Sequence, residues 1–345
     1  MQKFFLNKNE KKILLELVKN PITTDTTLSK KIKISITATQ NIRKKLEQTI
    51  IKKYTLSINP IALNFEFYVL FLFTANENRI KKIRQSKLHS HIMENSLCEF
   101  KVIDPIINRV IIKPFKNINE YHEFLIKTDE EYNDAIDLKE ILFLPLKNCT
   151  KYSKKHIYQN SILNNDFETS KNQKYEKNTI KEYTNKPISK NEQIVLKELA
   201  LNPRTKLMTM SKKLDLSITG ISKIINRLTK EGLINSFEII LDENLMNLTI
   251  GCLFLAHIKK LSDKKNILLE FLQTSGNVYR VFEISNTKHN IAFFTRFKSI
   301  NEVTKFIEHI NLNYSNSCQL KSSFIFSNSQ IIKPIDENFF IKQIN

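Results

Sequence analysis

Glycine is scarce in this 345-residue chain, which contains only four glycines and no tryptophan. Loops that bind nucleotide phosphates need several closely spaced glycines, because the backbone must approach the phosphate groups. The four glycines are scattered, so no glycine-rich phosphate loop is present. The H-E-x-x-H and G-x-S-x-G motifs are absent as well, which removes the usual signatures of zinc proteases and serine hydrolases.

Cysteines and long apolar runs are also few. The four cysteines form no C-x-x-C pair and are widely spaced, so we expect reduced, mostly buried thiols. Residues 1–6 are too short for a secretory signal, and the longest apolar run, residues 65–75, is too short to span a bilayer. These features predict a cytoplasmic, nucleoid-associated protein without a membrane partner.

Positive charge is abundant but unevenly distributed along the chain. The net charge is +19, from 54 basic and 35 acidic residues. Residues 1–60 contain 13 basic and 4 acidic side chains, whereas residues 61–149 contain 12 and 13. A uniformly Lys-rich composition does not explain this difference, but a surface that faces nucleic-acid phosphates does.

Residues 191–242 have the pattern of three short helices followed by a strand pair. Apolar residues recur at helical spacing before Asn202-Pro203, and proline disfavours a helical residue before it. Ser217 is placed to cap the third helix, and Gly232 is placed to end it. Alternation in residues 233–241 then predicts a β-wing. The order is that of a winged helix-turn-helix, whose third helix enters the DNA major groove.

The chain contains this unit twice. Shifting the sequence by 182 residues aligns residues 9–46 with residues 191–228, with 17 identities in 38 positions and no gap. The same shift aligns Phe115-Lys116 with Phe297-Lys298. The repeated unit therefore includes the region that follows each predicted winged helix.

Each of these following regions has the pattern βαββαβ, which is the order of a ferredoxin-like domain. In the first copy the expected elements are strand 63–75, helix 77–91, strands 98–103 and 109–113, helix 117–127 and strand 141–146. In the second copy they are strand 249–258, helix 263–274, strands 278–285 and 290–297, helix 300–310 and strand 322–327. The fold class predicted is α+β, with an internal duplication.

The order of signals resembles the Lrp/AsnC (leucine-responsive regulatory protein) family. The residues that carry the resemblance are Leu196, Leu199, Asn202, Arg204, Ser211, Leu214, Ser217, Ile221, Ile225, Leu228, Gly232 and Ile234. The resemblance implies a sequence-specific transcriptional regulator of double-stranded DNA. The family's effector site uses a glycine-containing turn, but residues 103–108 and 285–290 contain no glycine, which argues against an amino-acid effector.

The predicted organisation has six segments. They are a winged helix-turn-helix at 1–60, a ferredoxin-like domain at 61–149, a flexible basic linker at 150–190, a second winged helix-turn-helix at 191–242, a second ferredoxin-like domain at 243–328 and a tail at 329–345. The family pairs such units by dimerising, so here the duplication can supply both halves in one chain. Further self-association through the ferredoxin-like domains is compatible with the resemblance.

The predicted DNA contacts lie on the outer faces of the two third helices and on the first wing, because Gln and Asn can read adenine and Lys can reach guanine or phosphate. The residues predicted are Thr37, Gln40, Asn41, Lys44, Lys45, Lys52, Lys53, Thr219, Ser222, Lys223, Asn226 and Arg227. The two sets differ, so we expect an asymmetric DNA site to which the N-terminal unit contributes more.

Two other functions compete with the regulator. The turn at His289-Asn290 and the strand after it resemble the Lrp-like decarboxylases of the haem pathway, which act on tetrapyrroles such as sirohaem and use paired His and Arg there. A chromatin-like architectural protein would need only basic charge and tandem modules. His89 and His91 lack nearby ligands at metal spacing. The sequence thus predicts a regulator that is not an enzyme and needs no cofactor or metal.

Overall fold

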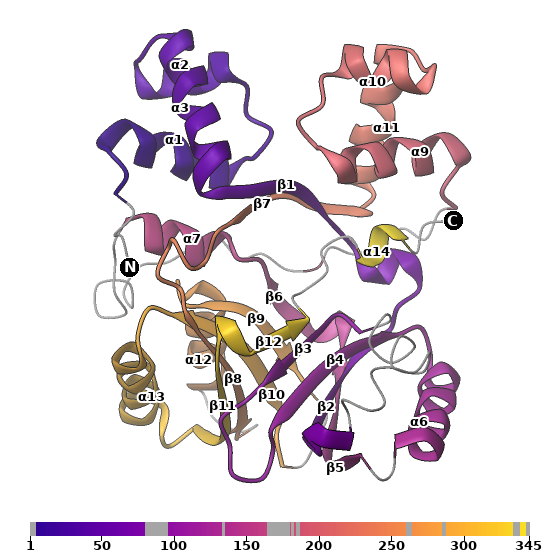
Figure 1. The fold of residues 1–345 in the computed structure, drawn as a ribbon, viewed down its shortest axis with the longest axis vertical. Coiled ribbons are helices and arrows are strands. Elements are labelled where there is room, and N and C mark those ends of the chain that lie inside the picture. Colours follow the sequence, from indigo (N-terminus) through magenta and orange to yellow (C-terminus); the bar gives the residue numbers. More distant parts are fainter. Residues whose placement is uncertain are drawn as a thin grey trace.

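A computed structural model of the chain describes residues 5–79, 96–132, 135–163, 180, 183, 187–259, 264–284, 288–333 and 339–342 (Figure 1). Among these residues, no helix combines the length and apolar character that a membrane span requires. The predicted helix 77–91 lies mostly outside the described residues, and so do His89 and His91.

Three helices and a strand form each of two heads at one end of the molecule (Figure 1). The first head contains α1 (Lys8–Lys19), α2 (Asp25–Ile32), α3 (Ile36–Thr49) and β1 (Ile51–Ile58). The second contains α9 (Lys190–Leu201), α10 (Leu207–Leu214), α11 (Ile218–Lys230) and β7 (Ile234–Leu241). Ser217 caps α11 as its sequence position indicates, and Ser35, its equivalent in the first copy, caps α3.

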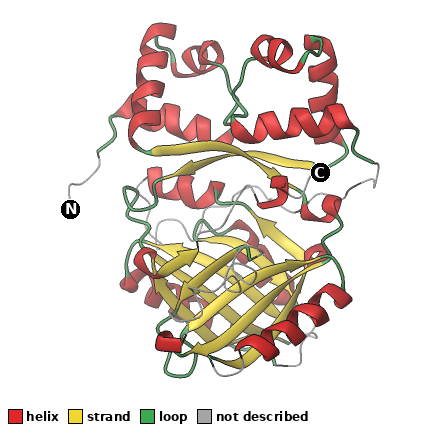
Figure 2. Ribbon diagram, turned by 45° about the vertical axis from the view of Figure 1, so that its right-hand side comes forward, coloured by secondary structure: helices red, strands yellow, loops and turns green. Residues whose placement is uncertain are grey.

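The strands of the two heads pair with each other. β1 and β7 form a two-stranded antiparallel ribbon, in which Ile51 lies opposite Leu241 and Ile58 opposite Ile234. The prediction of a strand pair inside the second head is therefore wrong, because β7 finds its partner in the other copy. The ribbon joins the heads and separates them from the sheets below (Figure 2).

Two five-stranded antiparallel sheets lie below the ribbon, in the orders β12-β3-β4-β2-β5 and β11-β8-β10-β9-β6. The first sheet contains β2 (Phe67–Ala75), β3 (Cys98–Lys101), β4 (Arg109–Phe115), β5 (Ile136–Pro145) and β12 (Ile331–Lys333). The second contains β8 (Ile250–Ile258), β9 (Val278–Glu283), β10 (Ile291–Phe297), β11 (Cys318–Ser327) and β6 (Cys149–Tyr152).

Helices cover the outer face of each sheet. In the second copy, α12 (Lys264–Thr274) and α13 (Ile300–Tyr314) complete the predicted βαββαβ order, and α6 (Ile118–Tyr132) is the equivalent of α13 in the first copy. Four strands of each sheet therefore have the same order in both copies.

The fifth strand of each sheet comes from the other copy. β6 pairs with β9, and β12 pairs with β3. β6 leads into α7 (Lys155–Ile162), and residues after β12 include α14 (Phe339–Lys342). The first part of the predicted flexible linker is therefore an ordered strand and helix, and the predicted tail also contains a strand and a helix. Local sequence did not reveal these elements, because each strand has a partner that is distant in sequence.

The inner faces of the sheets pack against each other in one core that also includes the heads. The rings of Phe100 and Phe326, from opposite sheets, stack with centroids 4.2 Å apart, and those of Tyr68 and Phe282 meet at 5.9 Å. The duplication thus supplies both halves of a face-to-face pair within one chain, as the sequence predicts. Three 3-10 turns at Pro60–Leu63, Leu146–Asn148 and Asn328–Gln330 connect these elements.

Candidate functional site

Most of the predicted DNA-contact residues on α3 and α11 are exposed. Ser222 and Arg227 are half-buried, and the exposed residues are Thr37, Gln40, Asn41, Lys44, Lys45, Thr219, Lys223 and Asn226. This exposure agrees with an outer helix face.

Two of the predicted contact residues each form an ion pair within their own head. Lys45 forms an ion pair with Glu10 at 2.7 Å, and Arg227 forms the equivalent ion pair with Glu192. Both glutamates are buried and complete the capping boxes of α1 and α9. Lys45 and Arg227 therefore neutralise buried carboxylates at a helix–helix contact, which the helical spacing alone did not reveal.

The two wing lysines, Lys52 and Lys53, line a cavity under the ribbon. They were predicted to contact DNA phosphates, but β1 lies between the heads and the sheets (Figure 1). Lys52 also forms an ion pair with Asp242 of the facing chain segment, at 3.3 Å. The two lysines therefore line a cavity together with residues of both sheets, and they do not lie on the outer surface of the heads.

This cavity has a volume of about 540 Å³, and we call it the cationic pocket. Its walls come from the ribbon, both sheets and the segments that connect them. Six basic side chains and one carboxylate line it, together with four aromatic rings. The basic residues are Lys52, Lys53, Lys154, Arg280, Arg296 and Lys333, the carboxylate is Glu243, and the aromatic residues are Phe100, Tyr279, Phe294 and Phe326.

Glu243 organises the positive charge in the pocket. Its carboxylate oxygens contact the Lys154 ammonium at 2.5 Å and the Arg296 Nε at 3.2 Å. Burial alone would raise the pKa of Glu243, but Lys154 and Arg296 outweigh burial and lower this pKa to about 2. The site therefore keeps one negative charge and a large excess of positive charge at neutral pH.

Arg296 is fixed in place by a flat apolar surface. Its guanidinium lies 5.2 Å from the centre of the Phe326 ring, and its Nη1 donates to Asn328 at 3.3 Å. A Cβ atom on Gly251, in the neighbouring strand, would lie 2.4 Å from Phe326 and 2.5 Å from Arg296. Glycine at this position is therefore what allows the ring and the guanidinium to occupy the pocket wall.

The aromatic residues give the pocket flat apolar walls beside its charges. Lys154 lies over the Tyr279 ring at 5.8 Å, and Tyr279 is buried. Burial raises the pKa of the Tyr279 hydroxyl and raises the pKa of the nearby Cys98 thiol to about 11, so both groups stay protonated at neutral pH. A planar polyanion matches this combination of rings and cations.

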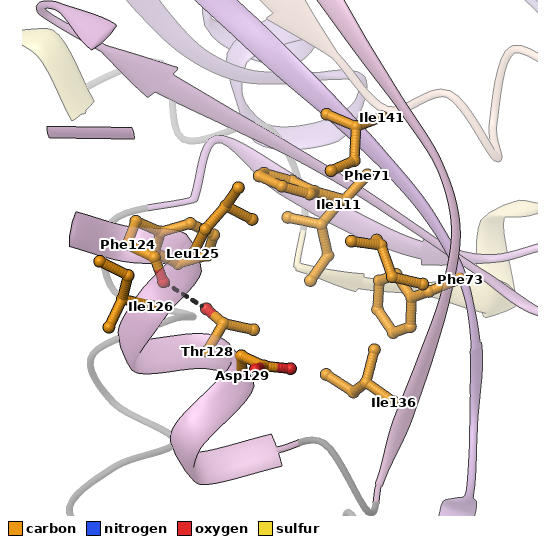
Figure 3. Close-up of a pocket in the computed structure, with 11 residues that line it drawn as sticks. Phe71, Phe73, Ile111, Phe124, Leu125, Ile126, Thr128, Asp129, Ile136 and Ile141 are labelled. Carbon is orange, nitrogen blue, oxygen red and sulfur yellow. Dashed lines mark hydrogen bonds between the residues drawn. The ribbon is translucent and has the colours of Figure 1, made fainter. Parts of the chain in front are cut away.

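A second hollow, of about 390 Å³, differs in chemistry (Figure 3). It lies between α6 and the first sheet, and its lining is apolar except for Thr128 and Asp129. The Thr128 hydroxyl is already bonded to the Phe124 carbonyl. With one carboxylate and no basic lining residue, this hollow does not attract an anion.

His289 is not part of the cationic pocket. It is fully buried, and its Nε2 lies 3.2 Å from Oε1 of Glu140 on the other sheet. Asn290 bonds to the backbone of Ile258, and its equivalent Asn108 bonds in the same way to Ala75. The His289-Asn290 turn thus has a structural role in joining strands. Of a His–Arg pair around this strand, Arg296 lines the pocket and His289 does not.

No protein-family profile and no curated protein matches this chain. Among solved structures, the siroheme decarboxylase NirDL matches 97% of this chain and 97% of that chain, with a TM-score of 0.61 and 12% identity. The same enzyme in co-complex with an iron-uroporphyrin III analogue matches with a TM-score of 0.60. LrpC of B. subtilis matches 44% of this chain, with a TM-score of 0.37 and 17% identity.

The full-length likeness establishes a shared duplicated fold. It also overturns the prediction that this chain is not an enzyme, because two structures of a decarboxylase match it along nearly its whole length.

We predict that Glu243→Gln makes the protein less stable at neutral pH and less sensitive to acid. Because the folded pKa of Glu243 lies below its ordinary value of 4.5, its stabilisation is complete above about pH 4.5 and is lost as pH falls toward about 2. The difference corresponds to about 3 kcal/mol. Urea unfolding between pH 7 and pH 2 measures it, with the exposed Glu308→Gln as control. Identical pH profiles for wild type and Glu243→Gln would contradict the assignment.

Proposed function

We propose that this chain binds a planar polycarboxylate of the tetrapyrrole class in the cationic pocket and removes carboxyl groups from it. The observation that carries the proposal is the pairing of six basic side chains with four aromatic rings around one cavity. The decarboxylase with the same full-length fold supports the choice of reaction. Its co-complex with an iron-uroporphyrin analogue supports the choice of ligand class.

The charges suit a ligand with carboxylates around its edge. Basic residues enter the pocket from the ribbon, from both sheets and from the segment before α7, so they surround a ligand from several sides. The aromatic rings offer faces for a macrocycle, and Arg and Lys supply charge-assisted hydrogen bonds. The volume lies within the range of about 300–1,000 Å³ that is typical of small-molecule sites.

Decarboxylation of an acetate substituent needs little from the protein beyond binding and a proton. The bond between the methylene carbon and the carboxylate breaks, carbon dioxide leaves, and the electron pair on the methylene carbon takes up a proton to give a methyl group. The reaction is redox-neutral and needs no second substrate. An apolar wall beside the carboxylate favours the loss of its charge.

We infer that Tyr279 supplies this proton. Burial raises the pKa of its hydroxyl, so the phenol is protonated at neutral pH, and Tyr279 lines the pocket beside Lys154. The Lys154 ammonium forms an ion pair with Glu243 and remains positively charged. The ammonium also lies over the Tyr279 ring, where its charge favours release of the phenolic proton.

Replacing Arg296 with methionine is expected to weaken the binding of uroporphyrin, because one buried charge-assisted contact is lost. Such contacts are worth about 1.5–3 kcal/mol, so the dissociation constant should rise roughly tenfold to a hundredfold. Absorbance titration of the porphyrin measures it. Lys223→Met on the exposed face of α11 is the matched control and should bind as wild type does. Equal weakening by both variants would show that only general charge attracts the ligand.

Replacing Tyr279 with phenylalanine is expected to lower kcat for decarboxylation about a hundredfold or more while leaving tetrapyrrole binding within about twofold. The ring remains, so the pocket wall is preserved and only the proton donor is lost. Product analysis by mass spectrometry under single turnover separates the two effects. An unchanged kcat would exclude Tyr279 as the donor, and a parallel loss of binding would show that it acts in recognition.

The heads support a second proposed function, binding of duplex DNA by winged helix-turn-helix units. The observation in its favour is the exposed polar face of α3 in the most basic part of the chain, residues 1–60. The ion pair of Lys45 with Glu10 narrows the proposed contacts on the last turns of α3 to Lys44. The heads and the cationic pocket are connected by the ribbon, so the two functions are compatible in one chain.

Lys44→Met is expected to weaken DNA binding and to reduce the slope of log K against log salt by about one, because one phosphate contact is lost. Lys45→Met should instead lower the free energy of unfolding, because the buried carboxylate of Glu10 loses its ion-pair partner. The salt slope of DNA binding should change little. Fluorescence anisotropy over a salt series, with urea unfolding in parallel, separates these effects. Indistinguishable slopes for wild type and Lys44→Met would remove α3 as a DNA contact.

A further inference from the structure

The duplicated strands allow each residue of the cationic pocket to be compared with its equivalent in the other copy. β2 and β8 begin their domains and occupy the same place in their sheets. Gly251 is the second residue of β8 and Tyr68 is the second residue of β2, so the two positions are equivalent. Their pairing partners correspond too. Gly251 lies opposite Arg296 and Phe326, whereas Tyr68 lies opposite Pro114 and Leu144.

The two equivalent positions differ in side-chain size and in the charge beside them, and both properties affect the binding of an anion. On one side, Gly251 leaves room for the guanidinium of Arg296 and the ring of Phe326. On the other side, Tyr68 fills that room itself and is fully buried, and Leu144 is fully buried beside it. Proline at 114 replaces the arginine, so the positive charge is absent there as well.

The helices that follow the exchanged strands show the same contrast. Tyr158 in α7 lies with its hydroxyl 3.5 Å from Glu243 of the pocket. The equivalent residue after a shift of 182 is Phe340 in α14, which has no hydroxyl. The Phe340 ring instead packs against Tyr68, with centroids 6.4 Å apart, and against Phe65 at 5.3 Å. We call Phe65, Tyr68 and Phe340 the aromatic plug.

The plugged side retains the equivalent of one pocket lysine, but this lysine is buried. Lys151 in β6 is equivalent to Lys333 in β12, and each donates to a backbone carbonyl, Ser275 and Ser96 respectively. Lys333 lines the cationic pocket, whereas Lys151 is fully buried. Burial lowers the pKa of Lys151 well below its ordinary value, so the sealed amine loses its charge more readily than an exposed lysine.

We propose that each chain binds one planar polyanion, in the cationic pocket alone, and that the equivalent position of the other copy is occupied by its own aromatic plug. The assignment of the ligand as a tetrapyrrole rests on the proposed function, but the single site does not. A homodimer of identical subunits would have two equivalent sites. Fusion of two copies in one chain allows one site to keep its charges while the other is filled with apolar side chains that stabilise the fold.

The experiment is a titration of the full-length protein with two planar polyanions, uroporphyrin and pyrene tetrasulfonate. We expect one equivalent of each per chain. Gly251→Tyr, which introduces the residue of the plugged side into the pocket, should weaken both at least tenfold. Tyr68→Phe is the matched control, since it keeps the ring in the plug, and it should leave both affinities within about twofold of wild type.

Gly251→Ala keeps the test decisive if the larger substitution does not fold, as judged by circular dichroism. Its single methyl group would meet Phe326 and Arg296 at the distances given above, so a severalfold loss of affinity is expected. Two bound equivalents per chain, or affinities unchanged in the folded glycine variants, would overturn the single-site proposal. Failure of both polyanions to bind would overturn it too. Binding of pyrene tetrasulfonate at one equivalent without uroporphyrin would leave the single site standing and refute the tetrapyrrole assignment.

Discussion

The antiparallel pairing of β1 with β7 is the constraint on which the arrangement of the whole molecule depends. Each strand follows the third helix of its own head and has its partner in the other copy, so neither head is complete without the other. The pairing brings the two domains below it face to face and leaves a space beneath the ribbon. Exchange of β6 and β12 between the sheets reinforces the same closure. The cationic pocket exists because these three pairings enclose it.

The buried charged side chains of the pocket stabilise one another. An isolated buried guanidinium would be destabilising, but Arg296 shares Glu243 with Lys154 and rests on the Phe326 ring. Since one carboxylate serves two cations and more basic residues stand around it, the pocket retains an excess of positive charge that a polyanionic ligand would neutralise. Gly251 makes the arrangement sterically possible, which explains why one of only four glycines lies inside a central strand.

Local periodicity and the internal repeat were sufficient to predict the helices of the heads, their capping serines, the four strands that each copy contributes to its own sheet, and the duplication. They were insufficient where the partner of an element is distant in sequence. The pairing of β1 with β7, the strands β6 and β12, and the place of Lys52 and Lys53 under the ribbon all depend on such partners. A signal for the pocket was nevertheless present: Arg280 and Arg296 stand inside otherwise apolar strands, where a charged residue needs a buried partner or a ligand. Glu243, Lys154 and Lys333 gave no comparable signal, because each lies in a polar connecting segment or at a strand end.

The most direct test of the account is incubation of the protein with sirohaem under anaerobic conditions, followed by mass spectrometry of the extracted tetrapyrrole. The account predicts products that are lighter by whole carbon dioxide units, formed by the wild type and lost when Arg296 and Lys154 are both replaced by methionine. Recovery of unchanged sirohaem after incubation with folded wild-type protein, to which it binds, would contradict the proposed reaction and leave the pocket as a binding site only.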